Sequence, residues 1–253
     1  MRFRRYVALG DSFTEGVGDH DATLPNGVRG WADRAAAVLA RHEPGFEYAN
    51  LAIRGRKLRP IIAEQLDPAL AMRPDLVTLY AGANDVLRPR VDLDGLLSEY
   101  DAAVERLVAG GAHVMLFTAY DPGGHPVFGA LRGRFAIYNE LVREIADRHG
   151  TTLVDFWRLR EYRDARMWDE DRMHMSASGH QRMAIAVLDA LGVEHDLRPA
   201  ELGEHHGVSN LAWAAGHAAP WIKRRLTGTS SGDSIEPRHP VPAPVDVATP
   251  EGV

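Results

Sequence analysis

The segment around Ser12 carries a side chain that could act on an acyl group. Ser12 follows a short apolar run at 6–9 and lies between Gly10 and Gly16. A serine hydroxyl becomes an effective nucleophile at neutral pH only when a neighbouring base accepts its proton. A serine directly after a strand can present that hydroxyl, and its own backbone N–H, to a ligand. The simpler alternative is a strand-to-helix turn in which Ser12 caps the helix.

A later loop holds a candidate for that base. His174 follows Asp171 by three residues and lies just before Ser176, which we expect to cap a helix. Histidine is the usual proton acceptor for a serine hydroxyl because its ordinary pKa is near neutrality. The carboxylate of Asp171 could bind the second ring nitrogen and orient the imidazole. The alternative is an acidic surface loop with a solvated histidine.

Two further strand ends carry groups that could stabilise negative charge on an acyl oxygen. Asn84 lies in the segment Gly-Ala-Asn-Asp at 82–85 and could donate its side-chain amide. Gly55 follows the apolar run at 48–51, and a glycine allows its backbone N–H to approach a ligand closely. Each residue alone is more simply a turn former. The interpretation therefore depends on a fold that brings both residues to Ser12.

The first 195 residues alternate apolar runs with helical patterns. The runs lie at 6–9, 48–51, 76–80, 114–118 and 152–155, and the helical patterns at 31–41, 58–72, 93–109, 135–148 and 177–191. Such near-continuous apolar runs are typical of strands buried on both faces of a parallel sheet. Repeated strand–helix units predict a three-layer α/β/α sandwich, in which ligands bind beyond the carboxyl ends of the strands. We expect Pro68 to break the second helix.

Together, the four segments resemble the signature blocks of the SGNH hydrolases, the GDSL-type esterase and lipase superfamily. The resemblance covers about residues 5–192, with the blocks in the family's order. Phe13 stands where the family has leucine, which should chiefly affect packing, and Met175 stands where many relatives have proline. The resemblance implies a flavodoxin-like sheet of five parallel strands, and neither a metal nor an organic cofactor.

The same resemblance implies a role for each candidate residue. Ser12 matches the family's nucleophile, and His174 and Asp171 match the Asp-x-x-His base and its partner. The oxyanion hole would consist of the backbone N–H groups of Ser12 and Gly55 and the amide of Asn84. The expected function is a serine esterase or acyl hydrolase that cleaves a carboxylic ester through an acyl-enzyme intermediate.

Two alternatives remain beside the esterase. An acyltransferase would use the same triad and differ only in the acceptor that resolves the acyl-enzyme. A non-catalytic small-molecule binder could use the glycine-rich segment 10–18 as a phosphate cradle. The chain has neither the P-loop nor the dinucleotide-binding fingerprint, which disfavours the binder.

Composition excludes several other classes of protein. The chain has no cysteine, which rules out disulfides, thiolate metal sites and a cysteine nucleophile. The histidines His195, His205 and His206 lack the regular ligand spacing of a metal site, so we expect none. A net charge of −6 gives no reason to expect nucleic acid or an anionic membrane as a partner.

The apolar runs also bear on membranes and targeting. None approaches the ~20 residues of a membrane-spanning helix, and the run at 6–9 is too short for a secretory signal. We therefore expect a cytoplasmic protein without a stable membrane anchor, whose partner is a small-molecule acyl ester. The sequence leaves the oligomeric state open.

Beyond the last helical pattern the composition changes. We expect a catalytic domain over 1–195, a partly helical extension over 196–227 and a disordered tail over 228–253. The tail is rich in proline and small residues and has little apolar surface to bury. We expect Trp213 and Trp221 to cover an apolar patch of the core; the alternative is that they meet a membrane surface through the basic residues at 223–225. The extension should then contribute to stability but not to chemistry, and the tail to neither.

Overall fold

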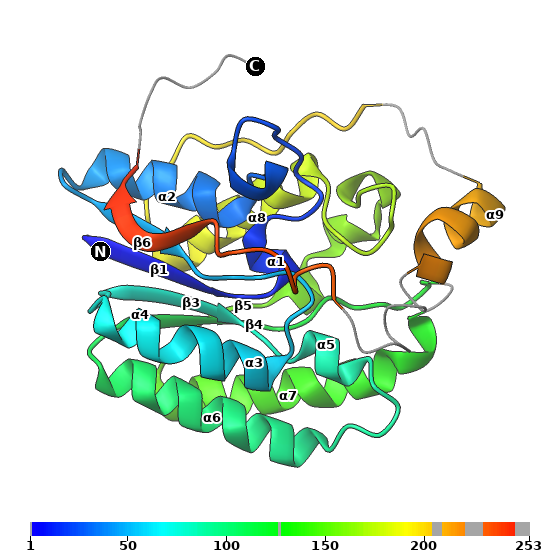
Figure 1. The fold of residues 1–253 in the computed structure, drawn as a ribbon, viewed down its shortest axis with the longest axis horizontal. Coiled ribbons are helices and arrows are strands. Elements are labelled where there is room, and N and C mark those ends of the chain that lie inside the picture. The colour runs from blue at the N-terminus through cyan, green and yellow to red at the C-terminus, as the bar shows by residue number, and fades with distance from the viewer. Residues whose placement is uncertain (1, 126–127, 204–208, 221–229, 246–253) are drawn as a thin grey trace.

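A mostly parallel sheet of six strands forms the centre of the computed structural model, which describes residues 2–125, 128–203, 209–220 and 230–245 (Figure 1). The strand order is β5-β4-β3-β1-β2-β6. The strands are β1 (Arg5–Gly10), β2 (Glu47–Asn50), β3 (Leu76–Tyr80), β4 (His113–Phe117), β5 (Thr152–Val154) and β6 (His239–Pro244). β1 to β5 are parallel, so the predicted α/β class and the flavodoxin-like strand order are confirmed.

Helices cover both faces of the sheet (Figure 1). One face carries α2 (Trp31–His42) and α8 (Ala177–Leu191), and the other carries α3 (Leu58–Ile61), α4 (Asp67–Ala71), α6 (Leu93–Ala109) and α7 (Arg132–His149). Short helices α1 (Ser12–Glu15) and α5 (Ala83–Val86) follow β1 and β3. Single 3₁₀ turns lie at Pro25–Gly27, Gly129–Leu131, Phe156–Arg158, Arg160–Arg163 and Ala165–Met167.

Local capping signals place the ends of the regular helices. The Asp92 side chain accepts a hydrogen bond from Gly95 N at the start of α6, and the Ser176 side chain accepts one from Gly179 N at the start of α8. Gly192 ends α8 in the left-handed conformation that favours glycine. Both helices therefore have the predicted bounds.

The helical segment that contains Pro68 differs from the prediction. Pro68 does not break it, because the five residues before α4 widen into a π-helical turn, Ile62–Leu66. A π turn changes the hydrogen-bond pattern at the point where proline has no N–H to donate. The turn also directs Gln65 into the core, where this side chain is 1% exposed.

A sixth strand corrects the expected five-stranded sheet and the expected disordered tail over 228–253. β6 pairs antiparallel with β2 at the edge of the sheet. Its sequence, HPVPAP, has a proline at every second position. Proline cannot donate to a ladder, so such a strand is tolerated at a sheet edge. Residues 230–245, here named the C-terminal strap, are therefore ordered, while 228–229 and 246–253 lie outside the described residues.

The strap is anchored by Arg238, whose side chain is completely buried. Its guanidinium donates to the backbone carbonyl oxygens of Pro25 (3.1 Å), Glu15 (2.9 Å) and Arg29 (2.6 Å). It also binds Asp33 Oδ2 at 2.6 Å. A guanidinium has five N–H donors in a fixed fork, so one side chain can satisfy this many acceptors. The low apolar content of the tail cannot reveal such an anchor, because Arg238 holds the strap through hydrogen-bond donors and not through apolar surface.

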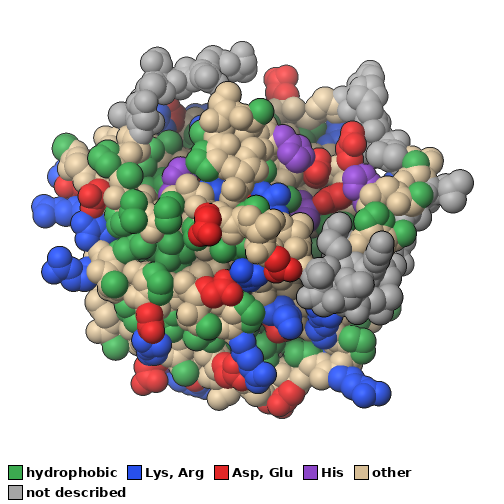
Figure 2. Space-filling view, in the orientation of Figure 1, with side chains coloured by type: hydrophobic (Ala, Val, Ile, Leu, Met, Phe, Trp, Pro, Cys, Tyr) green, Lys and Arg blue, Asp and Glu red, His purple; other side chains and the backbone are tan. Residues whose placement is uncertain are grey.

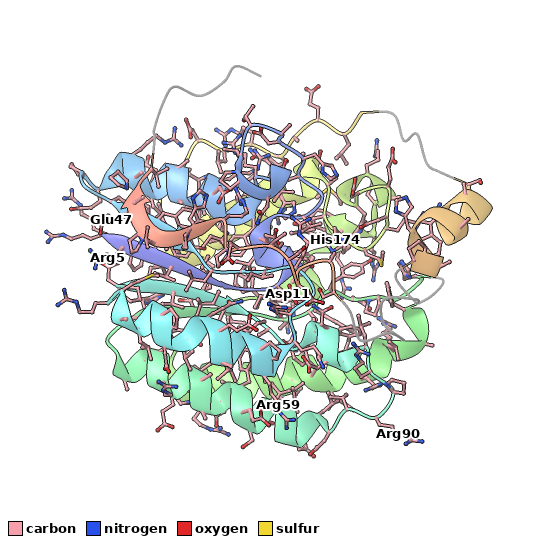
Figure 3. All side chains as sticks on the ribbon, in the orientation of Figure 1. Arg5, Asp11, Glu47, Arg59, Arg90 and His174 are labelled. Carbon is pink, nitrogen blue, oxygen red and sulfur yellow. The ribbon has the colours of Figure 1, made fainter. Side chains whose placement is uncertain are left out.

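The surface and the sheet ends show how charge is arranged. Acidic and basic side chains are interspersed on the face drawn in Figure 2. The Arg5–Glu47 ion pair lies at the amino ends of β1 and β2, whereas Asp11 and His174 lie near the carboxyl end of β1 (Figure 3).

Within the described residues, no helix is long and apolar enough to span a membrane.

Candidate active site

The turn after β1 places Ser12 at the carboxyl edge of the sheet. A side chain at Gly10 would put its Cβ 2.6 Å from the carbonyl oxygen of Tyr80 on β3, so only glycine fits. Two hydrogen bonds from Gln65 fix the backbone of Gly10. The side-chain oxygen of Gln65 accepts from Gly10 N at 2.8 Å, and its side-chain nitrogen donates to Gly10 O at 2.9 Å. Asp11 caps α1 by accepting from Phe13 N at 3.1 Å. Ser12 is consequently fixed at the first position of α1, half-buried.

The loop before α8 joins His174 to Asp171. His174 Nδ1 lies 2.5 Å from Asp171 Oδ2. The other carboxylate oxygen of Asp171 accepts from the backbone N–H groups of Met173 (2.8 Å) and His174 (2.9 Å). This pairing leaves His174 Nε2 as the nitrogen that can accept a proton. The structure thus joins the two residues that the Asp-x-x-His spacing singled out.

The pair also shifts the two pKa values in opposite directions. Burial raises the pKa of the Asp171 carboxyl, but its hydrogen bonds and the charge of His174 outweigh burial and hold that pKa well below its ordinary range. Burial lowers the pKa of His174, but the hydrogen bond and the charge of Asp171 outweigh it and raise that pKa above 6.5. Each residue therefore favours the charged form of the other.

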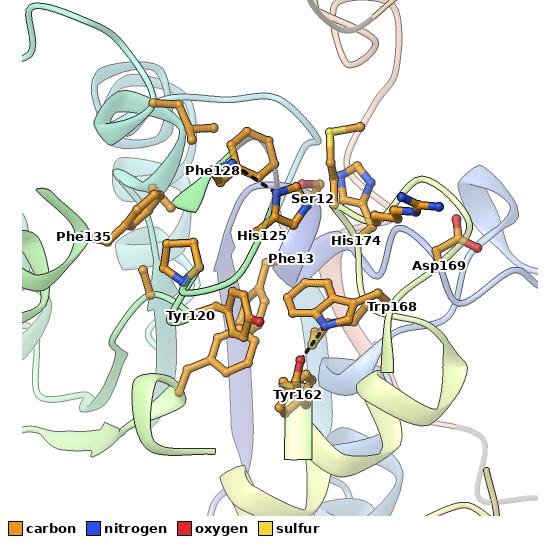
Figure 4. A pocket seen from close by; sticks show the side chains of 18 of the residues that line it. Ser12, Phe13, Tyr120, His125, Phe128, Phe135, Tyr162, Trp168, Asp169 and His174 are labelled. Carbon is orange, nitrogen blue, oxygen red and sulfur yellow. Dashed lines mark hydrogen bonds between the residues drawn. The ribbon is translucent and has the colours of Figure 1, made fainter. Parts of the chain in front are cut away.

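One cavity of about 750 Å³ brings the candidate residues together (Figure 4). Ser12, Asn84 and His174 all line it, as does Asp11. Asp171 is not in the described wall and lies behind His174 as its hydrogen-bond partner. A nucleophile, a base and an amide donor therefore face the same space, from the ends of β1 and β3 and the loop before α8.

Eight aromatic side chains form a large part of the remaining wall (Figure 4). They are Phe13, Tyr80, Tyr120, Phe128, Phe135, Phe156, Tyr162 and Trp168. The Tyr120 and Trp168 rings pack edge to face at 4.6 Å, and Phe13 lies 4.3 Å from the Tyr80 ring. Phe13 is thus part of the binding surface as well as of the packing. Several of these residues, such as Tyr120, Phe128 and Trp168, come from loops whose conformation cannot be read from spacing.

His125, in the loop after β4, also lines the cavity. Its ring stacks on Phe128 at 4.7 Å, and its Nδ1 accepts from Phe128 N at 3.1 Å. Burial lowers its pKa, although a hydrogen bond with the backbone of Arg172 opposes this. A ring whose Nδ1 accepts an N–H carries its proton on Nε2 when neutral. His125 is therefore arranged as a donor rather than as a base.

Asn84 is held by two acceptors at the edge of the cavity. Its side-chain nitrogen donates to Asp11 Oδ2 at 2.9 Å and to the backbone oxygen of Arg56 at 3.0 Å. Asp11 is 2% exposed, and burial raises its pKa to about 7. The sequence gives no sign of this contact between the first and third signature blocks.

Gly55 lies beside this group, but it is not in the described wall of the cavity. Its φ of +77° is the left-handed conformation that favours glycine. A Cβ there would clash with Ser230 of the strap. The preceding Arg54 is fixed by the fully buried Glu15, which accepts from Arg54 N at 2.6 Å and from its Nε at 2.9 Å. No described residue accepts a hydrogen bond from the N–H of Gly55 or of Ser12.

Comparison with known proteins shows the family of this chain. The model of the GDSL-like lipase/acylhydrolase family matches residues 8–182. The chain belongs to this family. The match includes all four signature blocks, so this GDSL-type protein is an esterase, a carboxylic ester hydrolase.

Individual relatives of this GDSL-type esterase agree in fold and class. An acetylxylan esterase from Geobacillus stearothermophilus is 29% identical over 168 residues, which cover 60% of this chain and 75% of that protein. An alpha/beta hydrolase enzyme from the metagenome of Lake Arreo, Spain, superposes with a TM-score of 0.63 at 27% identity, covering 76% of this chain and 97% of that chain. The structure of the Geobacillus stearothermophilus acetylxylan esterase gives a TM-score of 0.60 at 22% identity, over 76% of this chain and 95% of its own.

The described acidic and histidine side chains do not form a metal site. Within the described residues, no group of three or more histidine, aspartate or glutamate side chains is placed to hold a metal ion. His195 instead contacts Asp189 at 3.1 Å, and His205 and His206 lie outside the described residues.

Proposed function

We propose that this esterase hydrolyses its substrate with Ser12 as nucleophile, His174 as general base and Asp171 as the partner that orients His174. The observation that carries the proposal is the shared cavity: Ser12 and His174 both line it, and Asp171 holds the far nitrogen of the imidazole. This is the arrangement that serine acyl transfer requires.

In the first half-reaction Ser12 Oγ attacks the ester carbonyl carbon and its proton passes to His174 Nε2. The carbonyl double bond then reforms, the bond to the alcohol oxygen breaks, and His174 returns the proton to the leaving alcohol. Water attacks the acyl-enzyme in the same way, with His174 again taking and returning a proton. The net change is ester plus water to carboxylic acid plus alcohol, and Ser12 is regenerated.

Negative charge on the carbonyl oxygen would be received by three donors. They are the backbone N–H of Ser12, the backbone N–H of Gly55 and the side-chain amide of Asn84. Asn84 now donates to Asp11, so the oxyanion must take over one of its N–H bonds. Removing one such donor typically lowers the rate by about 10²–10³-fold.

The substrate we propose is a short-chain ester of a bulky hydroxyl compound such as an acetylated sugar. Two observations support it. The curated relative is an acetylxylan esterase, and the cavity of about 750 Å³ with its Tyr120 and Trp168 rings is far larger than an acetyl group needs. Aromatic faces of this kind offer apolar area with a few polar groups at the edge, which suits the faces of a sugar ring.

The test is ester hydrolysis by the wild type and by Ser12→Ala, with Ser98→Ala as control, because Ser98 is exposed on α6. Ser12→Ala should lose nearly all hydrolysis of p-nitrophenyl acetate and all labelling by a fluorophosphonate probe, while Ser98→Ala keeps both. Acetate release from acetylated xylo-oligosaccharides, compared with p-nitrophenyl butyrate and octanoate, tests the substrate class. Labelling of a different residue would contradict the assignment of Ser12.

A further inference from the structure

Trp213 is a buried residue of the C-terminal extension that touches the loop of the base. It ends the short helix α9 (Asn210–Trp213), which is followed by a π-helical turn, Ala214–Ala218. Trp213 is 6% exposed, whereas Ala212 and Ala215 beside it are exposed. Its indole Nε1 donates a hydrogen bond to the backbone oxygen of Asp171 at 2.7 Å. A segment in which Ala212 and Ala215 are exposed thus directs one buried side chain at the partner of His174.

The peptide that accepts this hydrogen bond has an unusual conformation. It joins Asp171 to Arg172, and Arg172 has a φ of +57°. The left-handed region is unfavourable for a residue that has a Cβ. The Arg172 guanidinium lies 5.2 Å from the centre of the Trp213 ring, and the His125 ring lies 6.3 Å from it. The indole therefore contacts both residues that this peptide joins, through the backbone oxygen of Asp171 and the side chain of Arg172.

The peptide belongs to the turn that holds the Asp171 carboxylate. With Arg172 left-handed, the N–H groups of Met173 and His174 reach back to Asp171 Oδ1. These two bonds leave the other oxygen free to meet His174 Nδ1. If the peptide flipped, its carbonyl would turn away from the indole. The ψ angle of Asp171 and the φ angle of Arg172 would then change together, which would loosen the backbone that carries the Asp171 carboxylate. The 2.7 Å bond to Trp213 opposes that flip.

We propose that Trp213 is a positioning residue of the esterase, whose indole N–H holds the Asp171–Arg172 peptide so that Asp171 stays aligned with His174. This inference rests on the proposed function, in which His174 is the base. It replaces the expectation that the extension contributes to stability alone.

Three substitutions separate the hydrogen bond from the ring. Trp213→Gln places an amide nitrogen as many bonds from Cβ as the indole nitrogen, and so keeps a donor without the ring. Trp213→Met has a similar length and no donor. Trp213→Phe keeps an aromatic ring and has no donor. Trp157→Phe is the control, because Trp157 carries the Arg132 guanidinium 5.7 Å from its ring and is not in the described wall of the cavity.

The readouts are kcat per fluorophosphonate-titrated site, KM, and the pH dependence of kcat/KM. Asp171, Asp11 and Asp169 are the carboxylates that act on His174, and His180 is the nearby histidine. Loss of alignment removes part of the effect of Asp171, which raises the pKa of His174. The rising limb of kcat/KM should therefore move to lower pH, a change that reduced folding alone does not cause.

We expect Trp213→Met and Trp213→Phe to lower kcat by about 10-fold or more with little change in KM, since small misplacements of catalytic groups have effects of this order. Both should shift the pH limb downward. Trp213→Gln should keep most of the wild-type kcat, and Trp157→Phe should match the wild type. If a variant fails to fold, benzothienylalanine at position 213 keeps the ring shape, replaces the N–H with sulfur and should give the same loss.

Two results would overturn the proposal. One is a kcat that follows the ring, so that Trp213→Phe stays active and Trp213→Gln does not. The other is an equal loss in all three variants with an unmoved pH limb, which would show packing alone. Ser12→Ala in the same assay distinguishes failure of the Trp213 proposal from failure of the proposed function. If Ser12→Ala kept the activity of the wild type, the triad itself would be refuted.

Discussion

The body of the molecule, residues 5–192, and its C-terminal segments, 209–220 and 230–245, are held in place by different forces. The body consists of strands and helices with repeated apolar positions, which pack into one core on each face of the sheet. The C-terminal segments are held by a few long-range polar contacts, chiefly those of Arg238 and Trp213. Local patterns can therefore predict the body, whereas the C-terminal segments become intelligible only once the body exists.

This difference shows why low apolar content is an imperfect sign of disorder. The free energy gained by hydrophobic burial is roughly proportional to the apolar area buried. A segment of proline and small residues therefore looks unable to fold. The strap instead supplies one guanidinium to acceptors already present in the body. A backbone carbonyl that is buried without a hydrogen-bond partner is unfavourable. The strap therefore stabilises the body and is also stabilised by it.

The strongest test of the body is Asp171→Asn, which should affect chemistry rather than architecture. An amide at this position favours the wrong tautomer of His174, and kcat should fall by up to about 10⁴-fold. In the wild type, kcat/KM should rise with pH, because the base must be neutral, with a midpoint above the ordinary histidine pKa of 6.5. Asp92→Asn is the control, since asparagine caps α6 as well as aspartate does. A pH-independent rate from pH 5 to 9, with chemistry rate-limiting, would refute the role of His174.

The matching test of the C-terminal segments is Arg238→Met. The change leaves the Asp33 carboxylate and three backbone carbonyls without their buried partner. Breaking a buried ion pair in this way should lower the free energy of unfolding by about 3–5 kcal/mol. Denaturant unfolding measures the change, and Val241→Ala on β6, where Val241 is 64% exposed, should stay within about 0.5 kcal/mol of the wild type. An unchanged midpoint for Arg238→Met would restore the view that the strap is dispensable.

Sequence reasoning reached the fold because the signals there are local. The bounds of α6 and α8 follow from Asp92, Ser176 and Gly192, which lie at the helix ends themselves. Pro68 was misjudged because its effect depends on the π turn before it, and β6 was missed because its partner β2 lies about 190 residues away. A short-range pattern contains no information about either.

The candidate site divides in the same way. Ser12, His174 and Asn84 were singled out because each belongs to a short block, and the structure brings all three to one cavity. Gln65 and Trp213 were not assigned to the site, because each acts through a hydrogen bond to a backbone atom more than 40 residues away. Backbone atoms are present at every position, so nothing in the residue types indicates these contacts.

Asn84→Ala tests whether the third block contributes to chemistry as well as to the wall of the cavity. We expect kcat to fall by about 10²–10³-fold with little change in KM, because an oxyanion donor acts chiefly in the transition state. Ser98→Ala, at an exposed position on α6, is the control. A raised KM with an unchanged kcat would make Asn84 a ground-state binding residue.

The smallest expected effect concerns Asp11, whose protonation depends on its burial. Burial raises its pKa from 3.8 to about 7. Between these pH values the folded protein binds a proton that the unfolded chain has lost, so this group's contribution to stability falls as pH rises from about 4 to about 7. Asp11→Asn removes that loss. Its melting temperature should therefore exceed that of the wild type by more at pH 8 than at pH 4.5, while activity decreases because one of the two oxygens that meet Phe13 N and Asn84 becomes an amide. Asp147→Asn, at an exposed position on α7, serves as the control. If the difference in melting temperature between Asp11→Asn and the wild type became smaller as pH rises, burial would not raise the pKa of Asp11.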